Sequence, residues 1–265
     1  MFTSSEAHEM HAPKRYLHFT ENAAARVFTD AANPECPAAN WAVLKAGHSY
    51  NVAQALAFCE EQFARAGVAA CFVWSPDAAP LAMCSDILQQ SGYHVGQTVV
   101  REFYTGAEES LDIRVNDCPV RLEDEPLRGA PGQLLAESCE GWPGRLNLLK
   151  KQLRAGAKAF FAYNRAEIPV SVCLGFGYAS AFRLFGLYTA PSQREKGYGM
   201  AALRAALRWA QKPEQKYEPF ALVQEENEKA VRLMRRAGFL GRPQQRWIAV
   251  RDGTPGTRQN DIFWL

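Results

Sequence analysis

The chain has 265 residues, of which 48% are hydrophobic and 22% are charged, and its formal net charge is +2. That length fits one large domain or two of ordinary size, and the apolar content suffices for a packed core. A charge so close to zero argues against nucleic acid or a membrane as the main partner. The first residues carry acids and histidines where a signal peptide needs an apolar core, and no apolar run reaches membrane-spanning length. We therefore expect a cytoplasmic protein.

The seven cysteines lie at scattered positions, without the paired C-x-x-C spacing of a zinc site or a redox motif. A disulfide framework belongs to small secreted chains with regular cysteine spacing, which this sequence does not resemble. We therefore expect free thiols, most of them buried, and no bound metal.

The first hundred residues end in a pattern that returns at the end of the chain. Residues 70–104 predict a strand, a helix that ends in Gly-Tyr, and a second strand. They align weakly with residues 219–250 when Gly92-Tyr93 is set against Gly238-Phe239. This weak repeat predicts two related domains, at 1–108 and 109–265, with the polar stretch 105–112 as the linker.

The second half has a clear order of predicted elements. Apolar runs at 157–164, 168–176 and 181–189 alternate with short turns, which predicts an antiparallel meander. Helical spacing of apolar residues over 200–210, followed by the apolar run 220–223, predicts a helix that joins two parallel strands. The remaining predicted elements are an opening strand at 118–124, two short helices within 132–153, a helix within 225–238 and a closing strand at 244–250. Together they predict an α+β domain.

A glycine-rich stretch, Arg194-Glu195-Lys196-Gly197-Tyr198-Gly199, lies just where the helix at 200–210 should begin. The first turn of a helix exposes backbone N–H groups without intrahelical partners, at the positive end of the helix dipole. Glycines permit a positive φ and a close approach of the ligand, while Arg194 and Lys196 add positive charge. The stretch therefore predicts a phosphate-binding turn. An ordinary surface turn is the alternative for an isolated Gly-x-Gly.

Two common phosphate-binding signatures do not fit this stretch. The P-loop pattern G-x-x-x-x-G-K-[ST] is absent. The dinucleotide pattern G-x-G-x-x-A is formally present at 197–202, but residues 190–196 separate it from the preceding strand. Only 66 residues (265 minus 199) follow Gly199, too few for the rest of a dinucleotide-binding domain. An NAD-dependent oxidoreductase is therefore disfavoured.

A third signature fits on both sides of the stretch. Residues 194–199 resemble the R/Q-x-x-G-x-G/A pyrophosphate loop of the GNAT superfamily of acyl-CoA N-acyltransferases. "LYTAP" at 187–191 is similar to the end of that family's fourth strand, and 227–239 is similar to its N-x-x-A-x-x-L-Y-x-x-x-G-F segment. The resemblance covers about 111–265. The first half resembles the degenerate first domain of a tandem member.

The resemblance implies a GNAT-like mixed, mostly antiparallel sheet flanked by helices, with acetyl-CoA as the co-substrate. The loop would bind the pyrophosphate, the fourth strand would pair with the pantetheine arm, and Asn227 would contact that arm or act as a helix N-cap. The strands on either side of the helix would splay apart to admit the arm. The residues implied for cofactor binding are Leu187, Tyr188, Thr189, Arg194, Glu195, Lys196, Gly197, Tyr198, Gly199, Met200 and Asn227.

The catalytic groups are less clear from the sequence. All five histidines lie at or before His94, so the second half has none of its own. Glu225 and Glu140 are candidates for the general base, although each also fits a solvated surface glutamate. Met234 stands where the family usually has a tyrosine that protonates the leaving thiolate, and methionine has no proton to donate. Tyr188 or Tyr198 is a possible substitute, or either side chain simply packs in the fold.

The resemblance therefore implies transfer of an acetyl group from acetyl-CoA to the primary amine of a small molecule or peptide, by direct attack on the thioester, in a monomer or homodimer. A non-catalytic acyl-CoA-binding or regulatory module is the alternative, because the acid and the base are not evident. A structural protein with a degenerate loop is the third possibility.

Overall fold

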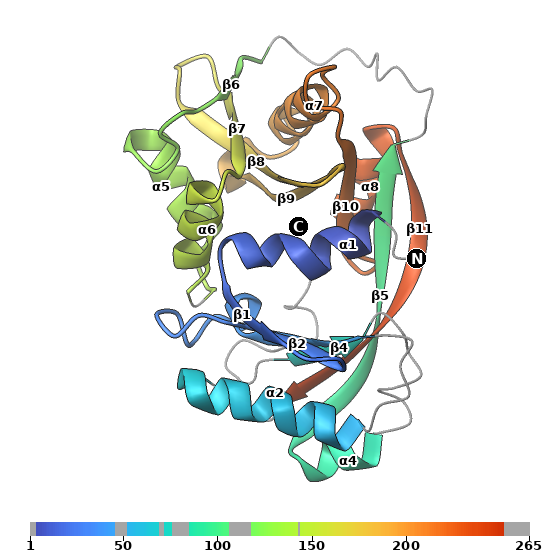
Figure 1. Ribbon diagram of the computed structural model, residues 1–265. Coiled ribbons are helices and arrows are strands. Elements are labelled where there is room, and N and C mark those ends of the chain that lie inside the picture. Colours follow the sequence, from blue (N-terminus) through green and yellow to red (C-terminus); the bar gives the residue numbers. More distant parts are fainter. Residues whose placement is uncertain are drawn as a thin grey trace.

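A computed structural model describes residues 4–45, 52–68, 72–75, 85–105, 118–142 and 144–251. These residues form an 11-stranded mixed sheet in the order β1-β2-β3-β4-β11-β5-β10-β9-β8-β7-β6 (Figure 1). All neighbouring strands are antiparallel except the pairs β3–β4 and β9–β10. The predicted α+β class, with a mostly antiparallel sheet flanked by helices, is confirmed.

The first half of the chain contributes the elements from α1 to β5. In chain order they are α1 (Ser4–His11), the 3-10 turn η1 (Ala12–Arg15), β1 (His18–Glu21), β2 (Ala25–Thr29), the turn η2 (Pro37–Ala39), β3 (Trp41–Leu44), α2 (Val52–Ala66), β4 (Phe72–Ser75), α4 (Ser85–Gln90) and β5 (Tyr93–Thr105). The predicted order of strand, helix and strand at the end of this half is confirmed. The predicted linker lies almost wholly outside the described residues.

The second half contributes the rest of the sheet. Its elements are β6 (Val120–Leu122), α5 (Gly129–Ser138), α6 (Arg145–Arg154), β7 (Lys158–Tyr163), β8 (Pro169–Tyr178), β9 (Ala181–Thr189), the 3-10 turn η3 (Pro191–Gln193), α7 (Tyr198–Ala210), β10 (Glu218–Gln224), α8 (Glu228–Arg236) and β11 (Phe239–Arg251). Each predicted element is present. The sequence predicts the closing strand at 244–250, whereas β11 begins at Phe239. The prediction starts too late because Gly241 and Pro243 are residue types that rarely occur inside a strand. Pro243 is tolerated there because β11 pairs with β4 only from Trp247 onward.

The two halves exchange their longest strands. β5 lies between β10 and β11 of the second half, and β11 lies between β4 and β5 of the first half. The two strands pair antiparallel along their full lengths, from Tyr93 opposite Arg251 to Thr105 opposite Phe239. The sheet is therefore continuous across the two predicted domains, and each half supplies one long strand to the sheet of the other.

Helices cover both faces of the second half of the sheet. Leu203 and Leu207 of α7 pack with Met234 of α8 on the face that includes Cys173 of β8. Leu135 of α5 packs with Val172 on the opposite face. The alternation of Val172 and Cys173 follows from the two-residue period of a strand, which turns successive side chains to opposite faces. The sheet therefore separates an α7 face from an α5 face.

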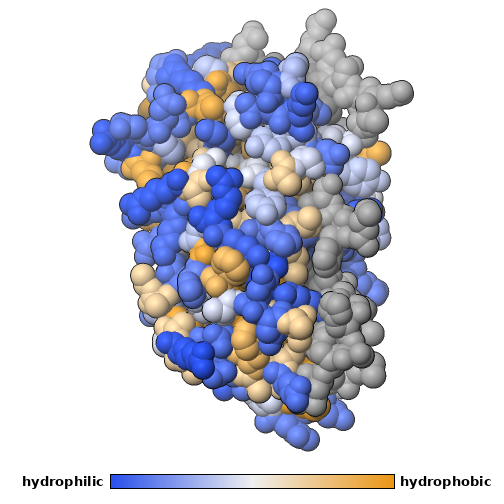
Figure 2. All heavy atoms as spheres, viewed as in Figure 1, coloured by the Kyte–Doolittle hydropathy of each residue, from blue (hydrophilic) through white to orange (hydrophobic). Residues whose placement is uncertain are grey.

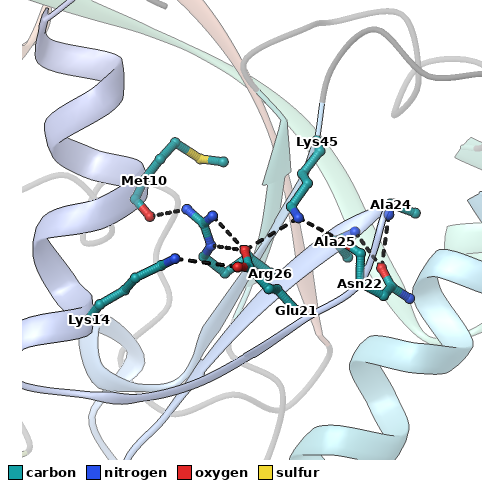
Figure 3. A network of polar contacts seen from close by, with 8 residues as sticks. All are labelled: Met10, Lys14, Glu21, Asn22, Ala24, Ala25, Arg26 and Lys45. Atoms are coloured by element: carbon teal, nitrogen blue, oxygen red, sulfur yellow. Dashed lines mark hydrogen bonds and ion pairs between the residues drawn. The ribbon is translucent and has the colours of Figure 1, made fainter.

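Helix α1 lies between the two halves in the centre of Figure 1, and buried polar contacts attach it to both. Ser5 hydrogen-bonds Glu102 of β5, Glu9 pairs with Arg246 of β11, and His8 contacts β8. Its C-terminal end is held by the first half, where the Arg26 guanidinium donates to the carbonyl oxygen of Met10 (Figure 3). Arg26 also binds Glu21 across β1 and β2, with Lys14 and Lys45 nearby. This network fixes α1 against the sheet.

The visible surface is largely hydrophilic, with apolar residues in small groups between charged ones (Figure 2). The most exposed large apolar side chains include Ile168 in the turn between β7 and β8 and Leu240 on β11. Among the described residues, no helix is both long and apolar enough to cross a membrane.

Candidate active site

The two parallel strands at the centre of the second half separate along their length. β9 and β10 pair from Ala181 opposite Glu218 to Leu184 opposite Ala221. Beyond that point β9 continues to Thr189 while β10 stays paired with β5 through Gln224. In the described part of the chain, this end of β9 therefore has a strand partner only on its β8 side. Its other edge is free to bind an extended ligand between the two strands.

A bulge interrupts β9 where the gap opens. Phe185 lies opposite Leu174 and Tyr188 opposite Val172, so Gly186 and Leu187 share a single facing residue, Cys173. Gly186 has a φ of 60°, and a Cβ atom there would lie 2.6 Å from Cδ1 of Leu174. The backbone conformation of the bulge favours glycine, and a side chain there would require Leu174 to move. It disrupts the backbone ladder at the mouth of the gap.

The predicted loop leads from β9 to the first turn of α7. The backbone at Glu195 has a φ of 64°, and Gly197, the N-cap of α7, has a φ of 88°. No side chain caps this helix end, so the N–H groups of its first turn are open to an acceptor from a ligand. A non-glycine residue in the left-handed region, as at Glu195, is uncommon.

The cations of the loop are exposed. Nε of Arg194 donates to the carbonyl oxygen of Thr189 at 3.1 Å, and Nζ of Lys196 donates to the carbonyl oxygen of Ser192 at 3.0 Å. Neither makes an ion pair within the described residues, although Glu195 lies between them in the sequence. Their positive charges are therefore available to an anion at the start of α7.

The buried hydroxyl of Ser171 and the half-buried hydroxyl of Thr189 lie beside the start of α7. Ser171 of β8 is fully buried, donates to the carbonyl oxygen of Tyr188 at 2.7 Å, and lies 2.8 Å from the hydroxyl of Thr189. A Cβ atom on Gly199 would lie 3.1 Å from that hydroxyl. The start of α7 thus packs closely on the end of β9, which brings residues 187–189 and 194–200 together at one end of the gap.

The side chain of Tyr188 points to the α5 face, away from α7. Its hydroxyl donates to Oε1 of Glu137 on α5 at 2.7 Å. Burial, together with this carboxylate, raises the pKa of Tyr188 to about 12. Glu140 is exposed after the end of α5, and its charge also acts on Tyr188. Sequence reasoning missed Glu137, although it lies three residues before Glu140.

The third candidate base, Glu225, is held in an ion pair. Its two oxygens accept from Nε and Nη2 of Arg101 on β5, at 2.7 and 2.5 Å. These hydrogen bonds lower the pKa of Glu225. Arg101 belongs to the exchanged strand β5, so the sequence of the second half alone does not reveal this partner.

Two other predicted positions have structural roles in α8. Oδ1 of Asn227 accepts from the backbone N–H of Ala230 at 3.2 Å, which makes Asn227 the N-cap of this helix. Met234 is fully buried in the core on the α7 face. Neither position supplies an ionisable group. Leu187, Tyr198 and Met200 are partly buried against the same core.

A histidine does reach the second half, from α1. Nε2 of His8 lies 2.8 Å from the carbonyl oxygen of Phe176 on β8, and the side chain is almost fully buried. Burial, and next the positive charge of Arg183, lowers the pKa of His8 to about 4. Sequence reasoning did not expect this, because His8 is 168 residues away from Phe176 in the chain.

Comparisons with known proteins bear on the family and the fold. Residues 137–239 match the model of the acetyltransferase (GNAT) family. A GCN5-related N-acetyltransferase from Kribbella flavida is 14% identical and has a TM-score of 0.67, with 93% of this chain and 94% of that chain covered. A functionally unknown conserved protein from Staphylococcus epidermidis is 12% identical, with a TM-score of 0.61 and coverages of 88% and 92%.

A tandem GNAT protein from the clavulanic acid biosynthesis pathway is also similar, with 12% identity and a TM-score of 0.56. The match covers 86% of this chain and 78% of that chain. At these identities the likeness establishes the fold, and it extends over both halves of the chain. No curated protein matches the sequence significantly.

Proposed function

We propose, from the match of residues 137–239 to the acetyltransferase (GNAT) family model, that the protein transfers an acetyl group from acetyl-CoA to a primary amine. The observation that carries the proposal is the gap between β9 and β10, with the glycine-rich loop and the start of α7 at its open end. Backbone groups there suit a phosphate, and the free edge of β9 suits an extended arm with amide groups, such as pantetheine.

In this proposal the pyrophosphate of coenzyme A lies against residues 194–199, with the backbone N–H groups of Gly199 and Met200 and the charges of Arg194 and Lys196 around it. The pantetheine arm runs along residues 187–189 toward the bulge. The thioester carbonyl then lies near Gly186 and Leu187, where a backbone N–H outside the ladder can stabilise the oxyanion. Asn227 borders the arm from the start of α8 while capping that helix.

The amine approaches from the α5 face, where Glu137, Glu140 and Tyr188 give a negative environment that attracts an ammonium group. The ammonium must lose a proton before its nitrogen attacks the carbonyl carbon. We assign the proton transfer to Tyr188 and Glu137: the phenol oxygen accepts the proton as its own proton passes to the carboxylate. The C–S bond then breaks and coenzyme A leaves as a thiolate.

The ion pair with Arg101 disfavours Glu225 as the base, since its carboxylate is already bound and its basicity is lowered. No acid at position 234 assists the thiolate. A thiol pKa near 8.5 makes the thiolate a tolerable leaving group at neutral pH, so the lack of an acid slows the reaction without preventing it.

One observation favours the alternative of a non-catalytic acyl-CoA-binding module. Met234 is buried in the core, so no group at that position can protonate the leaving thiol. A module of this kind binds acetyl-CoA without turnover, whatever amine is present.

The release of free thiol from acetyl-CoA in the presence of a broad panel of primary amines tests the proposal. We expect amine-dependent release that is reduced in Tyr188→Phe and unchanged in Arg165→Gln, a change in the exposed turn between β7 and β8. Binding of acetyl-CoA without release for any amine would instead support the non-catalytic module.

A further inference from the structure

Arg183 lies on β9, three positions before the bulge, between Phe176 of β8 and Phe220 of β10. Its neighbours Phe182 and Leu184 point to the α7 face. The alternation along a strand therefore turns Arg183 to the α5 face, on which Phe185 and Tyr188 also lie. Arg183 therefore lies on the face of the sheet from which the amine is proposed to approach.

Arg183 forms no ion pair within the part of the chain that the structure describes. Its Nε is buried without a hydrogen-bond partner, and among the described residues no carboxylate lies within ion-pair distance of the guanidinium. Two buried carboxylates that contact α1 or its partners, Glu9 and Glu102, are already bound. Glu9 accepts from Arg246 through both oxygens, at 2.9 and 2.7 Å, and Glu102 accepts from Ser5, Arg242 and Gln244. A half-buried arginine without an anion is costly unless a ligand supplies one.

A second cation, Arg145, lies close to Arg183. The guanidinium of Arg145, at the start of α6, is close enough for its pKa to be lowered, mainly by burial and also by the charge of Arg183. Glu9 is neutralised by Arg246 and Glu102 by Arg242. Neither of these two carboxylates is therefore available to neutralise Arg183.

His8 presents a second polar atom beside Arg183. Its Nε2 faces a carbonyl oxygen, which can only accept, so Nε2 carries the proton. Nδ1 is then a bare acceptor, and it is buried without a hydrogen-bond partner. Arg183 thus supplies a cation and His8 supplies a hydrogen-bond acceptor. A ligand that carries a carboxylate next to an N–H or O–H group would complement both.

We infer that Arg183 binds a carboxylate of the acceptor, so that the amine acetylated by this protein is an amino acid or a peptide. The inference rests on the proposed function and names its substrate class. Three residues of strand span roughly 10 Å, and the arginine side chain extends several more, so one acceptor can reach both Arg183 and the bulge. The planar fork of arginine matches a carboxylate with two parallel hydrogen bonds.

Matched pairs of amines that differ only in a carboxylate test the inference. Lysine is compared with cadaverine, and phenylalanine with phenethylamine, with aminoethyl phosphate as a separate arm. The assay measures kcat/KM in wild type, Arg183→Gln, Arg183→Lys and Arg165→Gln. Thermal stabilisation by each compound, measured with coenzyme A bound, provides a readout that does not depend on turnover.

We expect the wild type to prefer the carboxylated member of a pair by on the order of 10- to 100-fold. Arg183→Gln should lose this preference, Arg183→Lys should keep part of it, and Arg165→Gln should keep all of it. Binding of acetyl-CoA should be the same in all four proteins, which also shows that the variants fold.

Equal use of both members by the wild type, a preference that survives in Arg183→Gln, or a preference for the phosphate would each overturn the inference. If no amine is turned over, the thermal stabilisation by the two members of each pair is compared instead, and equal stabilisation of the wild type would likewise overturn the inference. An absence of acetyl-CoA binding by the wild type would instead overturn the proposed function.

Discussion

The hydroxyl of Tyr188 donates to Oε1 of Glu137 at 2.7 Å, which joins the end of β9 to α5 on the face opposite α7. The strand residue beside the proposed thioester position is thus coupled to a carboxylate from a different element. This pair is the basis of the proposed proton transfer.

Removal of the phenol should slow the chemical step. Tyr188→Phe keeps the ring and its packing but breaks the path from the amine to Glu137. We expect kcat to fall about 100-fold, within the range for loss of a general base, while the KM for acetyl-CoA stays unchanged. Glu137→Gln should give a similar loss. Steady-state kinetics of both variants check this, and a kcat within threefold of wild type for Tyr188→Phe would exclude the assigned role.

Glu225 should matter more for the fold than for the reaction. Its side chain is about one-third exposed (37%) and it binds Arg101 of the exchanged strand β5. Glu225→Gln should therefore lower the free energy of unfolding by about 1 kcal/mol or less and change kcat less than threefold. A double-mutant cycle with Arg101→Met measures the coupling between the two residues. A large loss of kcat with unchanged stability would instead identify Glu225 as the base.

The bulge in β9 should be sensitive to a single methyl group. Gly186→Ala requires a positive φ and places a Cβ 2.6 Å from Leu174. Gly67→Ala is the matched control, because Gly67 also has a positive φ but has nothing within 4 Å of an added Cβ. We expect Gly67→Ala to lose about 1 kcal/mol of unfolding free energy and Gly186→Ala to lose about 1–3 kcal/mol more. Equal losses, measured by denaturant titration, would show that the bulge has room for a side chain.

The docking of α1 should depend on pH through His8. Its pKa falls from 6.5 in the unfolded chain to about 4 in the fold, because burial and the charge of Arg183 disfavour the protonated form. Between these values the unfolded chain binds a proton that the folded protein does not. The free energy of unfolding is therefore not reduced by His8 above about pH 6.5, and it decreases as the pH falls from 6.5 toward 4.

The matched variant is His8→Gln, which can still donate to the carbonyl oxygen of Phe176 but does not titrate. Between pH 7 and pH 4, the free energy of unfolding of the wild type should fall by roughly 3 kcal/mol more than that of the variant. Denaturant titrations at several pH values measure this difference. Parallel pH profiles for the two proteins would contradict a buried neutral His8.

Local signals allowed much of the second half to be predicted from the sequence. The meander and the helix after the glycine-rich loop depend on spacings of a few residues, which a sequence displays directly. The N-cap at Asn227 was one of two roles that the sequence left open. The exchange of β5 and β11 could not be predicted, because both strands have ordinary patterns and only their pairing is unusual. Those long-range pairings also bring Arg101 to Glu225.

The groups around the site were predicted less well for the same reason. Tyr188 meets Glu137 across 51 residues, and His8 meets Phe176 across 168. The sequence marks neither pairing, since a tyrosine in a strand and a histidine in an N-terminal helix each fit many environments. From the sequence, Arg183 resembles any polar residue in an apolar strand; only the structure shows that no described carboxylate lies within ion-pair distance of it.

The most direct test of the account is the affinity for acetyl-CoA when the loop charges are reversed. Isothermal titration calorimetry compares wild type with Arg194→Glu/Lys196→Glu and with Arg154→Glu/Arg165→Glu, an equal reversal at exposed positions outside the loop. We expect the loop variant to bind at least about 100-fold more weakly than wild type, and the control to bind like wild type. Equal affinity in all three proteins, or no binding by the wild type, would contradict a coenzyme A site between β9 and β10.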